Sequence, residues 1–167
     1  MKRFTIAVLV RNQYGVLNRV TSMFRRRRFN IYSLTVSETE STEYSRITVS
    51  FDGFDNDKVQ LVNQLYKLPD VCSIKELGDE SVKCELVLIK MENDPETRND
   101  IKAAADAFGA RTVDYTRDSI VMQMTDSSDR IDSFVNLMRD YTILEICRTG
   151  IVSLERGSST IRKTEYL

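Results

Sequence analysis

The chain has 167 residues, a length that fits one domain of average size or two small ones. Apolar residues make up 41% of it, which is enough for folded cores, and charged residues make up 29%. No apolar run reaches about 18 residues, so we expect no transmembrane helix and no membrane partner. The net charge of −1 argues against binding of nucleic acid through overall basicity.

Charge distribution and cysteine usage suggest how the chain divides and where it works. Residues 1–76 carry an excess of basic side chains and residues 77–167 an excess of acidic ones, which suits two modules with different partners. The three cysteines, Cys72, Cys84 and Cys147, are odd in number and widely spaced. They therefore predict reduced thiols and a cytoplasmic location, not a disulfide framework. Cys84 and Cys147 lie within apolar runs and are expected in the core.

The first half of the chain predicts the order βαββαβ from its apolar periodicity. In chain order we expect a strand over residues 4–10, a helix over 16–27, strands over 31–37 and 44–52, a second helix, and a strand over 71–76. Asp55 is the expected cap of the second helix, and Pro69 should stop it. Its predicted apolar face includes Val59, Val62 and Leu65.

A polar connector over residues 77–81 separates this half from a second round of the same order. We expect a strand over residues 82–91, a helix, a hairpin over 111–125, another helix and a strand over 143–146. Asp94 and Pro95 should begin the first of these helices, Gly109 should end it, and Ser127 or Ser128 should cap the other. The predicted fold class is therefore α+β, with two tandem ferredoxin-like βαββαβ units.

The turn at residues 12–15 joins the first strand to the first helix. Asn12, Gln13 and Gly15 are turn formers, and glycine takes a positive φ without steric cost. The N–H groups that begin a helix lack intrahelical partners, and the helix dipole there favours an anion. The turn can therefore hold a small carboxylate, although the same pattern also suits a plain strand-to-helix connection.

The residues from Asn12 to Val20 and from Phe29 to Val36 closely resemble the small regulatory subunit of acetolactate synthase, also called acetohydroxyacid synthase. Further landmarks of that family are similar to Ser45–Thr48, Gln64–Leu68, Glu85–Lys90 and Arg148–Gly150 of this chain. The resemblance implies an N-terminal ACT domain, a module that binds amino acids, over residues 1–77. A second ferredoxin-like domain over residues 82–156 and a polar tail over 157–167 complete the expected organisation.

The resemblance also implies a homodimer, with an effector amino acid at the interface of two ACT domains whose sheets join edge to edge. The turn of one chain would hold the effector carboxylate through Asn12, Gln13, Tyr14, Gly15, Val16 and Leu17. Asn30 and Ile31 of the other chain would complete the pocket. Asn30 offers both donors and an acceptor, which suits an ammonium and a carboxylate. Arg148, Thr149 and Gly150 would have a role in subunit contact.

A catalytic partner follows from the same resemblance. The chain would have no catalytic site, cofactor or metal of its own. Thiamine diphosphate and magnesium, with FAD as a further candidate, would belong to the large catalytic subunit. The small subunit would raise the activity of that partner and make it sensitive to a branched-chain amino acid, with valine as the first candidate.

Two other functions stay open at the level of sequence. The chain could be a stand-alone ACT-type amino-acid sensor that serves another enzyme or a transcription regulator. It could also be a small enzyme, but it has no histidine and no recognisable nucleotide-binding or nucleophile motif. The run from Arg25 to Arg28 is expected to be a solvated helix end that complements the helix dipole. The alternatives for this run are a patch that binds nucleic acid and a patch that docks on an acidic partner subunit.

Overall fold

The structure is a computed structural model that describes residues 2–163. Its contacts divide the chain into two compact units. The first holds the chain up to Lys83 together with the segment from Ile151 onward, and the second is Cys84–Gly150. Each unit is a sheet with two helices in βαββαβ order, which confirms the predicted α+β fold class. Within the described residues, no helix is long and apolar enough to cross a membrane.

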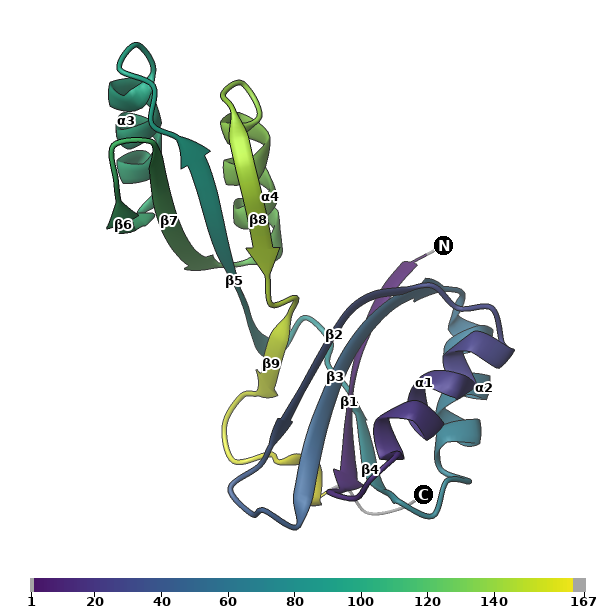
Figure 1. Ribbon diagram of the computed structural model, residues 1–167. Coiled ribbons are helices and arrows are strands. Elements are labelled where there is room, and N and C mark those ends of the chain that lie inside the picture. Colours follow the sequence, from purple (N-terminus) through teal and green to yellow (C-terminus); the bar gives the residue numbers. More distant parts are fainter. Residues whose placement is uncertain (1, 164–167) are drawn as a thin grey trace. The chain divides into compact units, whose positions relative to one another are not determined.

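The first unit is a four-stranded antiparallel sheet in the order β2-β3-β1-β4, so β2 and β4 are its edges. Its elements are β1 (Lys2–Arg11), α1 (Val16–Arg26), β2 (Ile31–Glu38), β3 (Tyr44–Gly53), α2 (Asp55–Leu65) and β4 (Val71–Glu76). Both helices lie on one face of the sheet (Figure 1).

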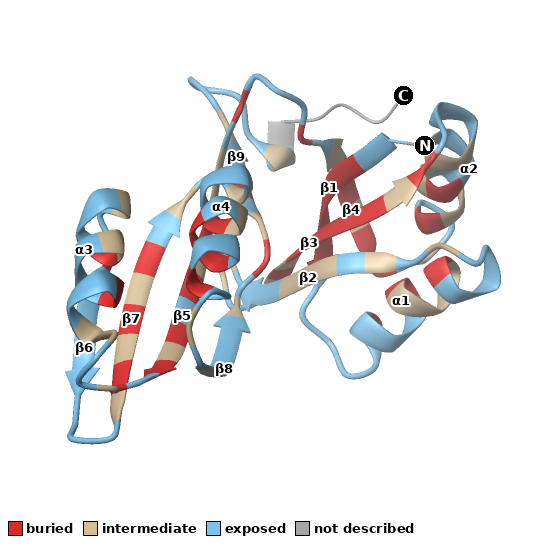
Figure 2. Cartoon of the chain, turned by 90° about the horizontal axis from the view of Figure 1, so that it is seen from above, coloured by how far each residue is buried: buried red, intermediate tan, exposed pale blue. Residues whose placement is uncertain are grey.

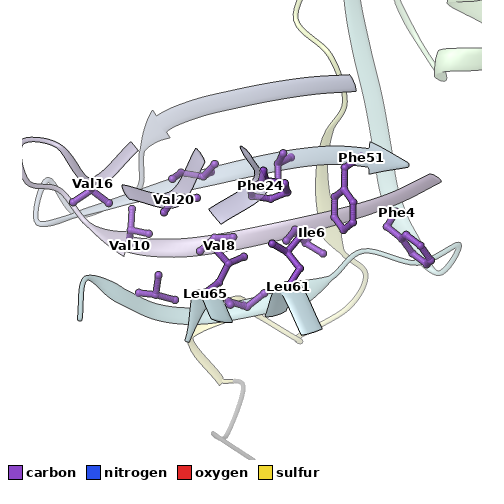
Figure 3. Close-up of a cluster of buried hydrophobic side chains, with 14 residues drawn as sticks. Phe4, Ile6, Val8, Val10, Val16, Val20, Phe24, Phe51, Leu61 and Leu65 are labelled. Carbon is purple, nitrogen blue, oxygen red and sulfur yellow. The ribbon is translucent and has the colours of Figure 1, made fainter. Parts of the chain in front are cut away.

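The core of the first unit lies between that face and the two helices. Alternate residues of β1, such as Ile6 and Val8, are fully buried and register opposite Val49 and Ile47 of β3. Figure 3 shows Ile6 and Val8 next to Leu61 and Leu65 of α2. The predicted face of α1 is confirmed, because Val16, Val20 and Phe24 are buried and Met23 packs against the cluster.

The opposite face of this sheet mixes polar and apolar residues, and much of it is buried. Thr5 and Ala7 of β1 register opposite Ser50 and Thr48 of β3, and all four are buried. The Oγ atoms of Thr5 and Ser50 are hydrogen-bonded at 3.0 Å, which offsets the cost of burying both hydroxyls.

The second unit repeats the topology as β6-β7-β5-β8, and a further strand, β9 (Val152–Glu155), pairs with β5. Its elements are β5 (Ser81–Glu92), α3 (Arg98–Phe108), β6 (Arg111–Tyr115), β7 (Ser119–Asp126), α4 (Ser128–Met138) and β8 (Ile143–Arg148). Alternate residues of β5 and β7 and one face of α4 are buried, so this unit has a core of its own. Figure 2 shows these buried residues in red.

Several local predictions were wrong at helix ends and on helix faces. Asp55 is the first residue of α2 and does not cap it; the carboxylate of Asp57 instead accepts a hydrogen bond from the backbone N–H of Phe54 at 3.1 Å. Val59 is exposed because Leu61 and Leu65 form the buried face of α2.

The start of α3 also differs from the prediction. Asp94 and Pro95 form a separate turn, in which the Asp94 carboxylate accepts from the Glu96 N–H at 2.9 Å. The helix itself begins at Arg98, after Thr97, and ends as predicted at Gly109, whose φ is 73°. Cys147 was expected in the core, but it is exposed on β8.

The described residues that follow β8 contact the first unit. We call residues 152–163 the C-terminal strap; they comprise β9, a loop and a short 3₁₀ helix, Ile161–Lys163. Residues 151–163 group with the first unit, whereas the sequence placed the end of the second domain at residue 156. The reason lies in the face of the first sheet away from the helices: Ser73 Oγ donates to the Ile161 carbonyl at 2.8 Å, and Lys75 pairs with Glu155 at 2.9 Å.

Candidate functional site

Gly15 is the N-cap of α1 and has a φ of 80°, in the left-handed region that disfavours residues with a Cβ. A Cβ added at this position would lie 3.1 Å from Nη1 of Arg19. The glycine therefore has a structural reason to be here, besides any role in binding. Tyr14, just before it, is fully exposed.

The first turn of α1 leaves donors unpaired. The helix has no side-chain cap and no acidic residue in its first turn. The Val16 N–H makes only a long contact of 3.4 Å to the Gln13 carbonyl. Across residues 2–163, no acceptor pairs with the backbone N–H of Leu17 or Asn18. These donors and the positive end of the helix dipole offer a carboxylate a place to bind.

Asn12 anchors the turn to the loop between β2 and β3. Its backbone N–H donates to the Glu43 carbonyl at 2.8 Å, and its Nδ2 donates at 3.0 Å to both Glu38 Oε1 and the Thr42 carbonyl. Both side-chain donors are therefore used within the chain. The structure gives Asn12 a positioning role for the turn, and leaves its Oδ1 as the atom that could face a ligand.

Arg19 and Asp70 form a second anchor that sequence reasoning missed. Arg19 Nε and Nη2 lie 2.8 and 2.7 Å from the same Asp70 oxygen, and Nη1 lies 3.5 Å from the Tyr14 carbonyl. The Asp70 carbonyl also accepts from the Arg11 N–H at 2.9 Å. Because 51 residues separate the two partners, no local pattern could have paired them. The anchor places a half-exposed guanidinium beside the turn, where it adds positive charge.

Asn30 and Ile31 do not meet the turn within one chain. The turn precedes α1 and Asn30 follows it, and an 11-residue helix rises by about 16 Å. Asn30 is exposed, and Ile31 registers opposite Phe51 at the start of the edge strand β2. The structure therefore brings Asn12–Leu17 together and places Asn30–Ile31 at the other end of the helix.

Arg148 is held by a network inside the second unit. Its Nε and Nη2 donate to Glu85 at 2.6 and 3.0 Å, and its Nη1 donates to Asp132 at 2.7 Å. These hydrogen bonds raise the pKa of Arg148, and the bonds to Glu85 have the largest effect. Glu85 is 1% exposed and also accepts from Ser128 Oγ at 2.8 Å.

Thr149 and Gly150 also have structural roles. Thr149 Oγ1 accepts from the Leu86 N–H at 3.1 Å, and Gly150 is buried with a φ of 74°. The three residues thus complete the end of β8. Their predicted role in subunit contact stays a prediction. No group of three or more metal-ligating side chains occurs among the residues that the structure describes.

Comparison with known proteins first gives the class of the chain. A model described as the small subunit-like ACT domain of acetohydroxyacid synthase matches residues 6–73. A second model, described as the small subunit of acetolactate synthase, matches residues 84–157. The βαββαβ topology of the first unit agrees with the first of these matches. The chain is therefore an ACT-domain protein with a second ferredoxin-like unit.

Whole-chain relatives give the particular family. The chain is 44% identical to a probable acetolactate synthase small subunit of Archaeoglobus fulgidus, over 93% of this chain and 98% of that protein. It is also 44% identical to an acetolactate synthase small subunit of Bacillus subtilis, over 95% and 92%. The crystal structure of the Thermotoga maritima small subunit superposes with a TM-score of 0.87 at 31% identity, over 95% of this chain and 100% of that one. The chain belongs to the family of acetolactate synthase small subunits.

Proposed function

We propose that this chain is the non-catalytic regulatory subunit of an acetolactate synthase. It binds the thiamine-diphosphate-dependent catalytic subunit, raises its activity and makes it subject to feedback inhibition by a branched-chain amino acid, with valine as the first candidate. Support comes from whole-length relatives that carry the name of this subunit and from the match of the first unit to an ACT domain. Thiamine diphosphate, magnesium and any FAD belong to the catalytic subunit in this proposal.

The effector site in this proposal is built by two chains. One observation carries this proposal: within one chain, the length of α1 separates Asn30 from the unpaired N–H groups of the turn. A site that uses both ends therefore needs a second copy. The two copies pair through β2, which is an edge strand of the sheet.

In this proposal the two copies of β2 pair over their full length. Two copies of β2 in antiparallel register about a two-fold axis align Ile31 of one chain with Glu38 of the other. Glu38 is the residue that holds Asn12, at 3.0 Å. Asn30 of the second chain therefore comes next to the turn of the first, although the two are far apart within one chain.

The chemistry of the assembled site suits a small amino acid. The N–H groups of Leu17 and Asn18, with Arg19 nearby, bind its carboxylate. Asn30 of the second chain and Asn12 Oδ1 accept from its ammonium group. When the effector binds one state of the complex more tightly than another, the difference in binding free energy is a coupling free energy, typically about 1–3 kcal/mol.

Reconstitution with the catalytic subunit from the same source tests the proposal. We expect the two chains to co-purify, and acetolactate formation from pyruvate to rise when this chain is added. Calorimetric titration of this chain with valine, isoleucine and leucine should then rank the effectors, and the tightest should inhibit the reconstituted enzyme most. An unchanged rate, with no complex formed, would contradict the proposal.

A further inference from the structure

A hollow of about 500 Å³ lies in the first unit, on the sheet face away from α1 and α2. Its floor includes Leu9 of β1 and Lys75 of β4, and the C-terminal strap forms its opposite wall. The strap is fixed there by Arg46 Nη2, which donates to the Ser153 carbonyl at 2.7 Å, and by the Ser73–Ile161 hydrogen bond. The volume falls in the range of small-molecule sites, about 300–1,000 Å³.

Glu155, which lines the hollow, has an unsatisfied carboxylate oxygen. Glu155 pairs through Oε1 with Lys75 Nζ at 2.9 Å, but its buried Oε2 has no hydrogen-bond partner among residues 2–163. Such an oxygen costs free energy until a donor reaches it. A ligand ammonium group removes that cost once a rotation of the Glu155 side chain turns this oxygen toward the hollow.

Cationic donors line the same hollow. Arg46 uses one of its N–H donors on the strap, and burial lowers its pKa because the charged guanidinium loses hydration. Lys75 also lines the hollow; it lies on β4, with β1 between it and the strand that carries Arg46. A ligand carboxylate bound beside Arg46 gives this guanidinium an anionic partner, whereas Lys75 already has one in Glu155.

The remaining wall decides between ligand classes. Leu9 and Leu77 are buried and Ile161 is half-buried, so part of the surface is apolar. The hollow is lined by three cationic side chains, Arg46, Lys75 and Arg162, and by three carboxylates, Glu38, Glu40 and Glu155. This balance disfavours a polyanion such as a nucleotide and suits a neutral zwitterion with an apolar side chain.

We propose that this hollow is a second small-molecule site, distinct from the turn, that takes an α-amino acid with an apolar side chain as its zwitterion. The ammonium group lies toward Glu155, the carboxylate toward Arg46, and the side chain against Leu9 and Leu77. Glu38 lines this hollow and also holds Asn12 of the turn, so the two sites share one side chain. Coupling between them is then reciprocal.

Calorimetry on the full chain tests the proposal with L-leucine as probe. The background is Asn18→Glu, which puts a negative charge at the turn and leaves the hollow unchanged. Two analogues accompany leucine: 4-methylpentanoate, which lacks the ammonium group, and leucinamide, which lacks the carboxylate. We expect leucine to bind this variant, and each analogue to bind about 10- to 100-fold more weakly, as expected for loss of a charge-assisted hydrogen bond.

Two variants locate the binding. Glu155→Gln should weaken leucine binding about 10- to 100-fold. Thr160→Trp fills the hollow without removing any of its ion pairs and should abolish binding, even where Glu155→Gln disturbs the fold. Thr125→Trp, at an exposed threonine of β7, is the matched control and should bind leucine normally.

Three results would overturn the second site: no leucine binding to Asn18→Glu at millimolar concentration, binding that Thr160→Trp leaves unchanged, or analogues that bind as tightly as leucine. None of these bears on the turn, because inhibition through the turn is read from the response of the wild-type chain in the reconstituted enzyme.

Discussion

Asn12 and Glu38 are joined by a hydrogen bond of 3.0 Å that ties the turn before α1 to the last residue of β2. The contact links the two features on which the proposed effector site depends. One is the cluster of unpaired helix N–H groups, and the other is the edge strand through which a second chain would supply Asn30. A substitution of Glu38 should therefore affect both the turn and the edge strand.

Removal of the Glu38 acceptor should loosen the turn. We expect Glu38→Ala to weaken valine binding about 2- to 10-fold, because a net hydrogen bond contributes about 0.5–1.5 kcal/mol. Glu38→Gln keeps an acceptor for Asn12 and should bind nearly as the wild type does. Calorimetric titration of the three proteins measures this, and equal affinities for wild type and Glu38→Ala would show that the contact does not position the turn.

Dimerisation should depend on the β2 edge. Val36 lies on β2 and is 41% exposed, and a lysine on an edge strand opposes strand pairing. We expect Val36→Lys to shift the full chain from dimer to monomer in sedimentation velocity. Val59→Lys is the matched control, since Val59 is 54% exposed on α2, away from the edge. Loss of the dimer in both variants, or in neither, would contradict pairing through β2.

The isolated chain should form no acetolactate. It has no histidine, and the proposal assigns thiamine diphosphate to the partner. Purified chain incubated with pyruvate, thiamine diphosphate, magnesium and FAD should give no product above a blank without protein. Turnover that follows this chain through successive purification steps would show that it carries catalysis of its own.

The Arg148 network should stabilise the second unit. Removal of one member of a buried ion pair costs about 3–5 kcal/mol, because the other charge stays buried without a partner. We expect Arg148→Met to destabilise this unit by that amount, because the substitution leaves the buried Glu85 without its cationic partner. Urea unfolding followed by circular dichroism measures the loss. The double variant Glu85→Leu, Arg148→Met should recover most of the loss. A small effect of the single variant would contradict the network's role.

The same double variant separates fold from subunit contact. If it folds, binds the catalytic subunit and activates it as the wild type does, Arg148 acts only within the second unit. Loss of activation in a folded double variant would support the predicted role of Arg148, Thr149 and Gly150 in subunit contact.

Local pattern predicted the elements well, because each has a period that a single stretch of sequence displays. The face of α1 and the alternation along β1 place apolar residues on one side at spacings that only a helix or a strand can use. The helix starts were less predictable. Asp94 followed by Pro95 suits a helix cap and an isolated turn equally, and the chain uses it for the turn.

Long-range contacts were beyond reach for a physical reason. The Arg19–Asp70 and Arg46–Ser153 contacts join residues 51 and 107 positions apart, and neither partner carries a local signal of the other. The C-terminal strap was for this reason assigned to a tail and to the second domain. The local pattern predicted the turn and its capacity to hold a carboxylate, and the family resemblance gave the full set of site residues. The positioning roles of Arg19 and Glu38 emerged only from the fold.

Gly15 itself is a poor place to test the effector site. Gly15→Asp adds charge near the proposed carboxylate, but it also puts a Cβ at a φ of 80° and 3.1 Å from Arg19. Lost inhibition in that variant could therefore follow from a distorted turn. Asn18, the third residue of α1, is exposed and helical, so its side chain can change without such strain.

The most direct measurement is the inhibition of the reconstituted enzyme by its effector, with Asn18→Glu and Asn18→Gln compared with wild type. An acidic residue in the first turn stabilises a helix by about 0.3–1 kcal/mol, so Asn18→Glu should fold and activate normally. Its carboxylate repels that of the effector by about 1–4 kcal/mol at roughly 4 Å. We expect the inhibitory effector concentration to rise about 5- to 850-fold for Asn18→Glu and to stay near the wild-type value for Asn18→Gln. Inhibition of Asn18→Glu at the wild-type effector concentration would contradict an effector site at the start of α1.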